Sequence, residues 1–242
     1  YVCIYLSWGW RIHRKKEAYI CLRYIQRMIK ILRDLDLKAD GVSIYNRKWQ
    51  HVHLRQGDMD GACTVYSVMM NLLILKVLTR NQVTDLSTTF KGTTSKGRLY
   101  KEFFKVEGLC RDGFVFADIN EKLSRSFRKE VSSVPQEYAA TQSEQALYLE
   151  ELRSAIDSEL SLMTAISFKG GAHAVLAIGY EEKAGFITKV FCLDPGYPIS
   201  KTALWNAVIM IDEGKGKYCH LYHTESDEYG VYVDESLKIT RR

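Results

Sequence analysis

The sequence contains few prolines, no low-complexity segment and no apolar run long enough to cross a membrane. Only 3 prolines occur in 242 residues, which argues against long disordered linkers. A membrane-spanning helix needs roughly 18 or more apolar residues, whereas the longest run, from Val65 to Leu78, is interrupted by Ser67, Asn71 and Lys76. No secretory signal is visible. We therefore expect no membrane span, and a protein that works in the cytoplasm or as a secreted effector.

The cysteines and histidines lack the spacing of a metal site. The cysteines are widely separated and include no C-x-x-C pair, which argues against a zinc site and favours free thiols in a reducing compartment. They are Cys3, Cys21, Cys63, Cys110, Cys192 and Cys219. His51 and His53 form an H-x-H pair without an evident third ligand, so we expect loop or surface histidines. No metal or organic cofactor is expected, and the net charge of +5 does not indicate a nucleic-acid partner.

The beginning of the chain has the pattern of a basic helix. Residues 14–37 carry apolar side chains at helical spacing with arginines and lysines around them, which predicts an amphipathic helix. We expect it to dominate a helical N-terminal extension over residues 1–55, in which residues 42–55 are irregular. Its basic face is expected to be solvated, or to contact a protein partner.

The rest of the chain divides into a helical half and a sheet half. In residues 56–160, Thr141 and Glu144 match a capping box that opens a helix to about Leu160. In residues 161–242, alternation with a period of two predicts strands. We expect them at residues 162–168, 172–181, 186–194, 204–212, 217–224 and 229–233. Helices followed by antiparallel strands predict an α+β fold, here as a single domain over residues 1–242.

The stretch around Cys63 has the pattern of a nucleophile at a helix start. Asp58 and Gly61 are typical of turns and helix starts, and Cys63 opens the apolar run. The N-terminus of a helix lowers the pKa of a thiol. Gln56 lies seven residues earlier, from where its amide could donate to the oxygen that becomes negative when a thiolate attacks a carbonyl. A cysteine in this position is, taken alone, more often a small buried apolar side chain.

A catalytic thiol needs a base, and the base needs an orienting group. His173 follows two glycines and begins an apolar strand, although a core histidine with one hydrogen bond fits that setting equally well. Asp194 ends the next expected strand. A hairpin turn centred between Lys183 and Ala184 places His173 directly opposite Asp194 on one face of the sheet. A slip of one residue would send one of the two side chains to the other face.

These residues resemble the papain-like cysteine peptidases in their order along the chain. The sequence GGAHAVLAIGY followed by VFCLDPGYP is most similar to the bacterial branch that cleaves double-glycine leaders, and the resemblance covers the Cys63 segment and roughly residues 160–198. It implies a papain-like fold and a protein or peptide substrate that is cleaved through an acyl-enzyme. It also implies that Cys63 is the nucleophile, His173 the general base and acid, Asp194 its orienting group, and Gln56 an oxyanion donor with the backbone N–H of Cys63.

One residue departs from the pattern of this family. The family usually has glycine directly after the cysteine, and here Thr64 stands there, with a β-branch that narrows the space beside the sulfur. Three alternatives stay open: a transglutaminase-like acyltransferase, a binding module that kept the fold and lost the chemistry, and an effector protease whose basic first helix docks a partner. Thr64 favours the binding module. The leader peptidases are commonly fused to a membrane transporter. Because this sequence has no membrane segment, their substrate does not transfer to it.

Overall fold

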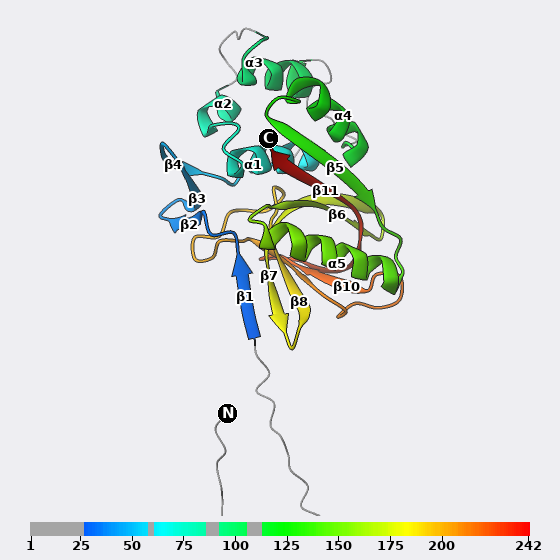
Figure 1. The fold of residues 1–242 in the computed structure, drawn as a ribbon. Helices are drawn as coiled ribbons and strands as arrows, with labels where there is room; N and C mark the ends of the chain where they lie inside the picture. The colour runs from blue at the N-terminus through cyan, green and yellow to red at the C-terminus, as the bar shows by residue number, and fades with distance from the viewer. Residues whose placement is uncertain (1–26, 58–60, 86–91, 106–112) are drawn as a thin grey trace, which may run out of the picture.

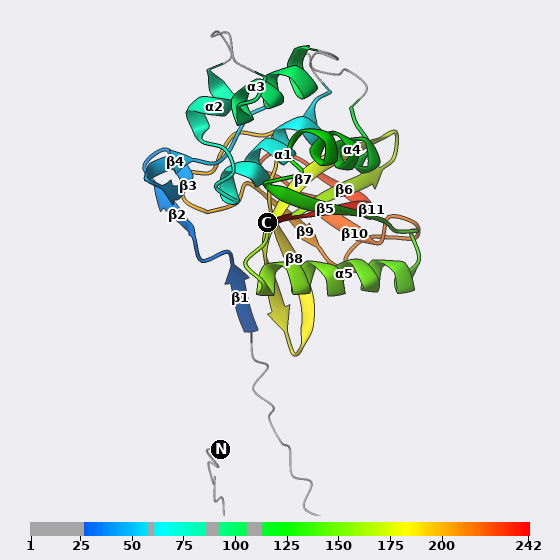
Figure 2. The ribbon, with the colours of Figure 1, turned by 45° about the horizontal axis from the view of Figure 1, so that its top comes forward.

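The structure, a computed structural model, describes residues 27–57, 61–85, 92–105 and 113–242. The expected mixture of helices and antiparallel strands is confirmed (Figure 1). The helices are α1 (Cys63–Ile74), α2 (Arg80–Thr84), α3 (Ser95–Leu99), the π-helical η1 (Tyr100–Lys105), α4 (Phe116–Ser126) and α5 (Gln142–Asp157). Figure 2 shows α1–α4 above the main sheet and α5 below it.

The main sheet closes on itself. Its strands are β1 (Arg27–Ile31), β5 (Val131–Glu137), β6 (Leu162–Phe168), β7 (Gly171–Lys183), β8 (Phe186–Leu193), β9 (Ala207–Met210), β10 (His220–His223) and β11 (Glu228–Arg241). Six of them follow the order β7-β6-β11-β10-β9-β8, and β8 pairs back with β7. Closure removes the free edges of these strands. The two others are additions, since β1 pairs with β7 and β5 with β11.

All six strands expected after Leu162 are present. β6 has the expected bounds, β9 and β10 are shorter than expected, and β11 continues to Arg241. The sequence did not indicate β5, because its residues are mostly polar and exposed. Pro135 in the middle of β5 lies opposite Leu237 of β11. Proline is tolerated there because β5 is an outer strand, whose second side needs no hydrogen bonds from the sheet.

The helix expected over residues 14–37 is wrong in its described part. Residues 27–31 form β1 and residues 35–38 form β2 (Leu35–Lys38); the residues before 27 lie outside the described part of the chain. β1 pairs antiparallel with β7 from Arg27 opposite Lys183 to Ile31 opposite Gly179. Pairing with this strand outweighs a helical spacing of apolar residues, because intrinsic helix preference is weak compared with tertiary contacts.

The basic residues of this segment are paired within the protein. Lys30 Nζ lies 2.7 Å from an oxygen of Asp157, Arg33 Nε lies 2.7 Å from an oxygen of Glu159, and Arg27 is bonded to Glu181. The helical basic face expected to contact a partner is therefore absent from the described residues of this segment. Its arginine and lysine side chains instead join β1 and the turn after it to β7 and the end of α5.

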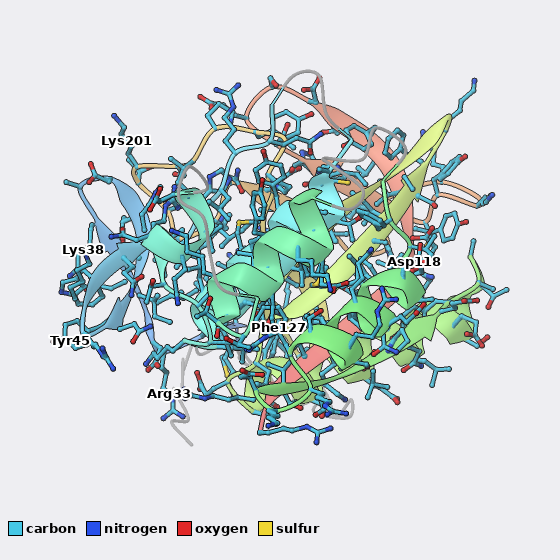
Figure 3. The ribbon with its side chains drawn as sticks, turned by 90° about the horizontal axis from the view of Figure 1, so that it is seen from above. Arg33, Lys38, Tyr45, Asp118, Phe127 and Lys201 are labelled. Carbon is cyan, nitrogen blue, oxygen red and sulfur yellow. The ribbon has the colours of Figure 1, made fainter. Side chains whose placement is uncertain are left out.

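A second, small sheet replaces the irregular segment expected at residues 42–55. β2, β3 (Gly41–Asn46) and β4 (Lys48–His51) form an antiparallel three-stranded sheet. Figure 3 shows it at one side of the molecule, with Lys38 and Tyr45 at its outer edge. Val42 and Ile44 are buried, so the alternation that marks a strand was present in this segment. The small sheet leads directly into the loop before Cys63.

α1 is the central helix. Ten of its 12 residues are buried, and it packs on β6 and β7. It ends at Ile74 rather than at the end of the apolar run, because Lys76 adopts a left-handed backbone conformation with φ of 56°. The start of α5 is confirmed, since the Thr141 side chain accepts a hydrogen bond from the Glu144 backbone N–H. In the described parts of the chain, no helix is long and apolar enough to cross a membrane.

Candidate active site

Cys63 is the first residue of α1. Two polar side chains of this helix, Ser67 and Asn71, bond to backbone carbonyl groups in or next to the main sheet. Ser67 Oγ donates to the carbonyl oxygen of Ala174 at 3.1 Å, and Asn71 Nδ2 donates to that of Ser161 at 3.4 Å. Ala174 directly follows His173 in β7. The bond from Ser67 therefore joins the first turns of α1 to the strand segment that carries His173.

His173 connects the thiol to a buried carboxylate. Its imidazole lowers the pKa of the Cys63 thiol, and its Nε2 lies 2.6 Å from Asp194 Oδ1. Since Nε2 faces the carboxylate, Nδ1 is the ring nitrogen left for the sulfur. The side chain of His173 is 16% exposed and that of Asp194 is fully buried. The structure thus brings together three residues that are far apart in the sequence.

The expected register between β7 and β8 is wrong, but the contact survives. The hairpin turn consists of Ala184 and Gly185, both with positive φ, so Lys183 pairs with Phe186 and the turn is centred one residue later than expected. The pairing shifts by one residue between Glu182 and Glu181 and shifts back between Gly179 and Ala177. Leu176 therefore pairs with Leu193 in the register that the turn sets. His173 is therefore a diagonal rather than a direct neighbour of Asp194. A displacement of two residues keeps both side chains on one face.

The carboxyl group of Asp194 is bonded on both oxygens. Oδ1 accepts hydrogen bonds from His173 Nε2 and, at 2.7 Å, from the backbone N–H of Gly196. Oδ2 accepts one from the hydroxyl of Tyr222. A side chain on residue 196 would crowd this group, because a Cβ there would lie 3.2 Å from Asp194 Oδ1 and 3.6 Å from His173. Glycine at this position allows the turn after β8 to approach the imidazole.

Interactions among Cys63, His173 and Asp194 shift the pKa of each of these groups. Burial raises the pKa of the Cys63 thiol, but the hydrogen bond and positive charge of His173 outweigh it, and the pKa lies below its ordinary value. Burial lowers the pKa of His173, whereas its bonds to Asp194 and Cys63 raise it to about 10. Burial raises the pKa of Asp194, but His173 and Tyr222 together lower it. Each of these interactions favours the charged form of its group, namely the thiolate of Cys63, the imidazolium of His173 and the carboxylate of Asp194.

Thr64, which stands where the resembled family usually has glycine, anchors the start of α1. It is buried, and its Oγ1 donates to the carbonyl oxygen of Phe114 at 2.9 Å. Its hydroxyl oxygen lies 4.0 Å from the sulfur of Cys63, and this contact is among those that lower the pKa of the thiol. The β-branched side chain is thus directed to the segment before α4.

The loop before Cys63 is joined to the turn after Asp194. The backbone N–H of Gln56 donates to the carbonyl oxygen of Pro195 at 2.8 Å. This bond brings the backbone of Gln56 to the turn that follows Asp194. Gln56, half-buried, therefore lies on a segment attached to the same part of the fold as His173 and Asp194.

The expectation that His51 and His53 are loop or surface residues is wrong in part. His51 is half-buried in β4, and His53 follows β4 but is only 3% exposed. His53 Nε2 lies 2.8 Å from the carbonyl oxygen of Asp194. Burial lowers the pKa of His53 to about 4, so its imidazole is neutral at pH 7. Among the residues that the structure describes, no group of three or more potential ligands could hold a metal ion.

Two residues at Asp194 were not found from the sequence, namely Tyr222 in β10 and Asn206 just before β9. Tyr222 is fully buried, and a buried tyrosine usually finds a partner for its hydroxyl group. Asn206 Oδ1 accepts a hydrogen bond from the backbone N–H of Asp194 at 2.7 Å, and its Nδ2 donates to the carbonyl oxygen of Asp194 at 2.9 Å. Both lie in segments expected to be strands, but no spacing rule connects either one to Asp194.

No protein-family model and no curated protein sequence matches the chain. Among solved structures, it is similar to the crystal structure of UfSP from C. elegans, with a TM-score of 0.42 and 15% identity. The similarity covers 92% of this chain and 36% of that chain, so this chain spans about a third of the length of UfSP. Similarity at this level identifies no family.

Proposed function

We propose that the protein is a papain-like cysteine peptidase that hydrolyses a peptide or isopeptide bond. The observation that supports this most strongly is the imidazole of His173, which is hydrogen-bonded to the buried Asp194 carboxylate and lowers the pKa of the Cys63 thiol. A nucleophile, a base and a group that orients the base are the minimum set for thiol catalysis. The depressed pKa of Cys63 adds the reactive form of the nucleophile.

The first half of the proposed reaction forms an acyl-enzyme. The thiolate of Cys63 attacks the carbonyl carbon of the scissile amide, and the carbonyl oxygen becomes negative. When this intermediate collapses, the C–N bond breaks and the imidazolium of His173 gives its proton to the leaving amine. Asp194 holds Nε2 during this step, so that the proton is transferred from Nδ1, the nitrogen that faces the sulfur. The acyl group is then bonded to the sulfur as a thioester.

The second half of the reaction releases the acyl group. Neutral His173 takes a proton from a water molecule, whose oxygen attacks the thioester carbonyl. The C–S bond breaks, the product leaves as a carboxylic acid, and Cys63 and His173 return to the thiolate–imidazolium state. No metal or organic cofactor takes part in the proposed mechanism.

We assign Gln56 the role of oxyanion donor, together with the backbone N–H of Cys63. An amide N–H is a suitable donor to an oxygen that becomes negative, and such donors act at full strength only when they are held in place before the reaction. The bond from the Gln56 backbone to Pro195 supports this assignment, because it attaches the segment that carries Gln56 to the turn beside the base.

The proposal is tested by loss of cleavage on substitution of Cys63. Wild-type protein and Cys63→Ala are incubated with a proteome-derived peptide library that includes Gly-Gly sequences, and new N-termini are identified by mass spectrometry. We expect cleavage by the wild type and none by Cys63→Ala, with unchanged circular dichroism. Cys219→Ala is the matched control, because this half-buried thiol has a raised pKa and should leave cleavage intact. A Cys63→Ala protein that cleaves at the wild-type rate contradicts the proposal.

The same assay separates the alternatives. If an added primary amine such as cadaverine is joined to the peptides in place of water, the acyl-enzyme is intact but the protein is an acyltransferase. If no peptide is cleaved or modified and Cys63 alkylates like an ordinary thiol, the fold is a binding module without the chemistry. A Gly-Gly preference among the cleaved peptides would extend the resemblance to the double-glycine leader peptidases.

A further inference from the structure

We propose that Tyr222 and Asn206 are positioning residues that fix Asp194 and, through it, the imidazole of His173. This inference rests on the proposed function, because both residues act on the carboxylate that orients the base. Tyr222 holds the carboxyl group, whereas Asn206 holds the backbone of the same residue.

Hydrogen bonds hold both oxygens of the Asp194 carboxyl group. Its Oδ1 receives His173 Nε2 at 2.6 Å and the Gly196 N–H at 2.7 Å, while its Oδ2 receives the Tyr222 hydroxyl. Asp194 is fully buried. If the carboxylate rotated about Cβ–Cγ, a buried charged acceptor would lose a hydrogen bond, which is unfavourable. Tyr222 thereby fixes the rotation of the carboxylate in which one oxygen is directed at the imidazole.

The hydroxyl group of Tyr222 is a permanent donor in a fixed place. Burial and the nearby charge of Asp194 raise the pKa of Tyr222 well above its ordinary value, so the hydroxyl group stays protonated at any working pH. A carboxylate can only accept, which makes the direction of this bond unambiguous. The position of the ring is set by the sheet, since Tyr222 in β10 pairs with Ile209 of β9 and Tyr229 of β11.

The backbone of Asp194 is held by Asn206. One amide group of Asn206 bonds both its N–H and its carbonyl oxygen, at 2.7 and 2.9 Å. Nδ2 of Asn206 also lies 3.2 Å from the carbonyl oxygen of Tyr197 and 3.1 Å from that of Pro198. The backbone N–H of Asn206 donates in turn to Cys192 of β8 at 3.1 Å. Asn206 therefore holds the turn after β8 against the segment just before β9, next to the residue that carries the carboxylate.

The consequence for the site is a fixed imidazole. With Oδ1 held against Nε2, the ring of His173 presents Nδ1 to Cys63, and the bond and charge of His173 lower the pKa of the thiol. If Asp194 can turn, the ring loses this orientation and the thiolate loses its donor. A misplaced donor typically reduces a rate by one to two orders of magnitude. The effect should be visible in the reactivity of Cys63 without any substrate.

The experiment measures alkylation of Cys63 by iodoacetamide between pH 5 and pH 9, with the modified residue identified by mass spectrometry. For Tyr222→Phe, we expect the rate at pH 6 to fall about tenfold and the pH at which the rate is half-maximal to move upward. Asn206→Ala should shift the profile in the same direction. With a peptide substrate, both variants should lower kcat and leave KM nearly unchanged, because neither residue is placed to contact substrate.

Tyr148→Phe is the matched control. Tyr148 is also fully buried, and its hydroxyl group lies 3.2 Å from Thr164 Oγ1. This variant loses a buried tyrosine hydroxyl of the same kind at a position where no hydrogen bond to Asp194 is lost. We expect a lower Tm and an unshifted alkylation profile. If Tyr222→Phe does not fold, Asn206→Ala carries the test alone.

The possible results separate this inference from the proposed function. If wild-type Cys63 alkylates like an ordinary thiol and His173→Ala changes nothing, the proposed function fails and the positioning role fails with it. If wild-type Cys63 is reactive at pH 6 and His173→Ala abolishes that reactivity, but Tyr222→Phe and Asn206→Ala follow the wild-type profile, only the positioning role is overturned.

Discussion

His53 should make the folded protein sensitive to mild acid. Its side chain is 3% exposed, and its Nε2 faces the carbonyl oxygen of Asp194. The guanidinium of Arg80 lies beside it, since Nη1 donates to the carbonyl oxygens of His51 at 3.0 Å and His53 at 2.5 Å. A proton on His53 would therefore bury a positive charge next to another one. Burial first, and His51 and Arg80 in addition, lower the pKa of His53 to about 4.

The size of the effect follows from the difference between the pKa of His53 in the folded protein and its pKa in the unfolded chain. In the unfolded chain a histidine titrates at about 6.5, so on acidification the unfolded state binds the proton first. The free energy of unfolding is then highest above about pH 6.5 and falls until the pH reaches the folded-state pKa of about 4. Through this linkage between protonation and folding, His53 alone lowers the free energy of unfolding by an amount on the order of 2 kcal/mol between pH 7 and pH 5.

The assay is urea unfolding at pH 7 and at pH 5, followed by circular dichroism, for wild type and His53→Gln. The glutamine amide can donate to the Asp194 carbonyl oxygen but does not titrate. The loss on acidification should be smaller in His53→Gln by about 2 kcal/mol, because other titrating groups contribute equally to both proteins. Tyr148→Phe is the control: it removes a buried hydroxyl group whose pKa lies well above its ordinary value, so the substitution should leave the difference unchanged.

One result would refute the reasoning. If wild type and His53→Gln lose the same free energy of unfolding between pH 7 and pH 5, His53 does not carry the buried, neutral imidazole described above. A larger loss in the variant would have the same meaning. The difference between the two proteins is the relevant quantity, since the free energy at either pH alone also includes the packing cost of the substitution.

Three further predictions concern packing. Leu72→Ala removes a fully buried side chain from α1 and should lower the free energy of unfolding by about 2–5 kcal/mol in urea titrations; a loss below about 1 kcal/mol would contradict the central place of α1. Gly179→Ala places a Cβ 2.4 Å from the carbonyl oxygen of Lys30, so β1 should detach from β7 and its amides should lose protection in hydrogen exchange, whereas retained protection would be inconsistent with this pairing. Gly196→Ala places a Cβ 3.2 Å from Asp194 Oδ1 and should slow Cys63 alkylation at pH 6 several-fold. Gly92→Ala, where the Cβ meets no atom within 4 Å, is the control and should leave the reactivity unchanged.

The helix predicted over residues 14–37 shows where periodicity misleads. Apolar residues at helical spacing, with basic residues between them, predict an amphipathic helix from the local sequence alone. In the described part, Arg27, Lys30 and Arg33 instead have as partners carboxylates of β7, of α5 and of the turn after α5. A strand partner contributed by residues about 150 positions later, such as Glu181 for Arg27, leaves no mark in a local window of sequence.

The contact between His173 and Asp194 shows the opposite case, in which a wrong detail left a useful expectation intact. The hairpin turn lies one residue later than expected, at Ala184 and Gly185, where the chain adopts positive φ twice. The partners are thereby displaced by two residues, and a period of two returns each side chain to the same face. An error of one residue in the pairing would have separated the imidazole from the carboxylate.

The sequence by itself determined which chemistry the chain offers: a cysteine at a helix start, a histidine after two glycines, an aspartate at a strand end, and alternating strands after Leu162. Only the tertiary structure decided that Tyr222 and Asn206 meet Asp194, that His53 is buried behind it, and that β1 lies against β7. The physical reason is that helix caps, turns and alternation arise from interactions between near neighbours in the chain. The partners of a buried carboxylate come from separate strands, and the closure of the whole sheet brings them together.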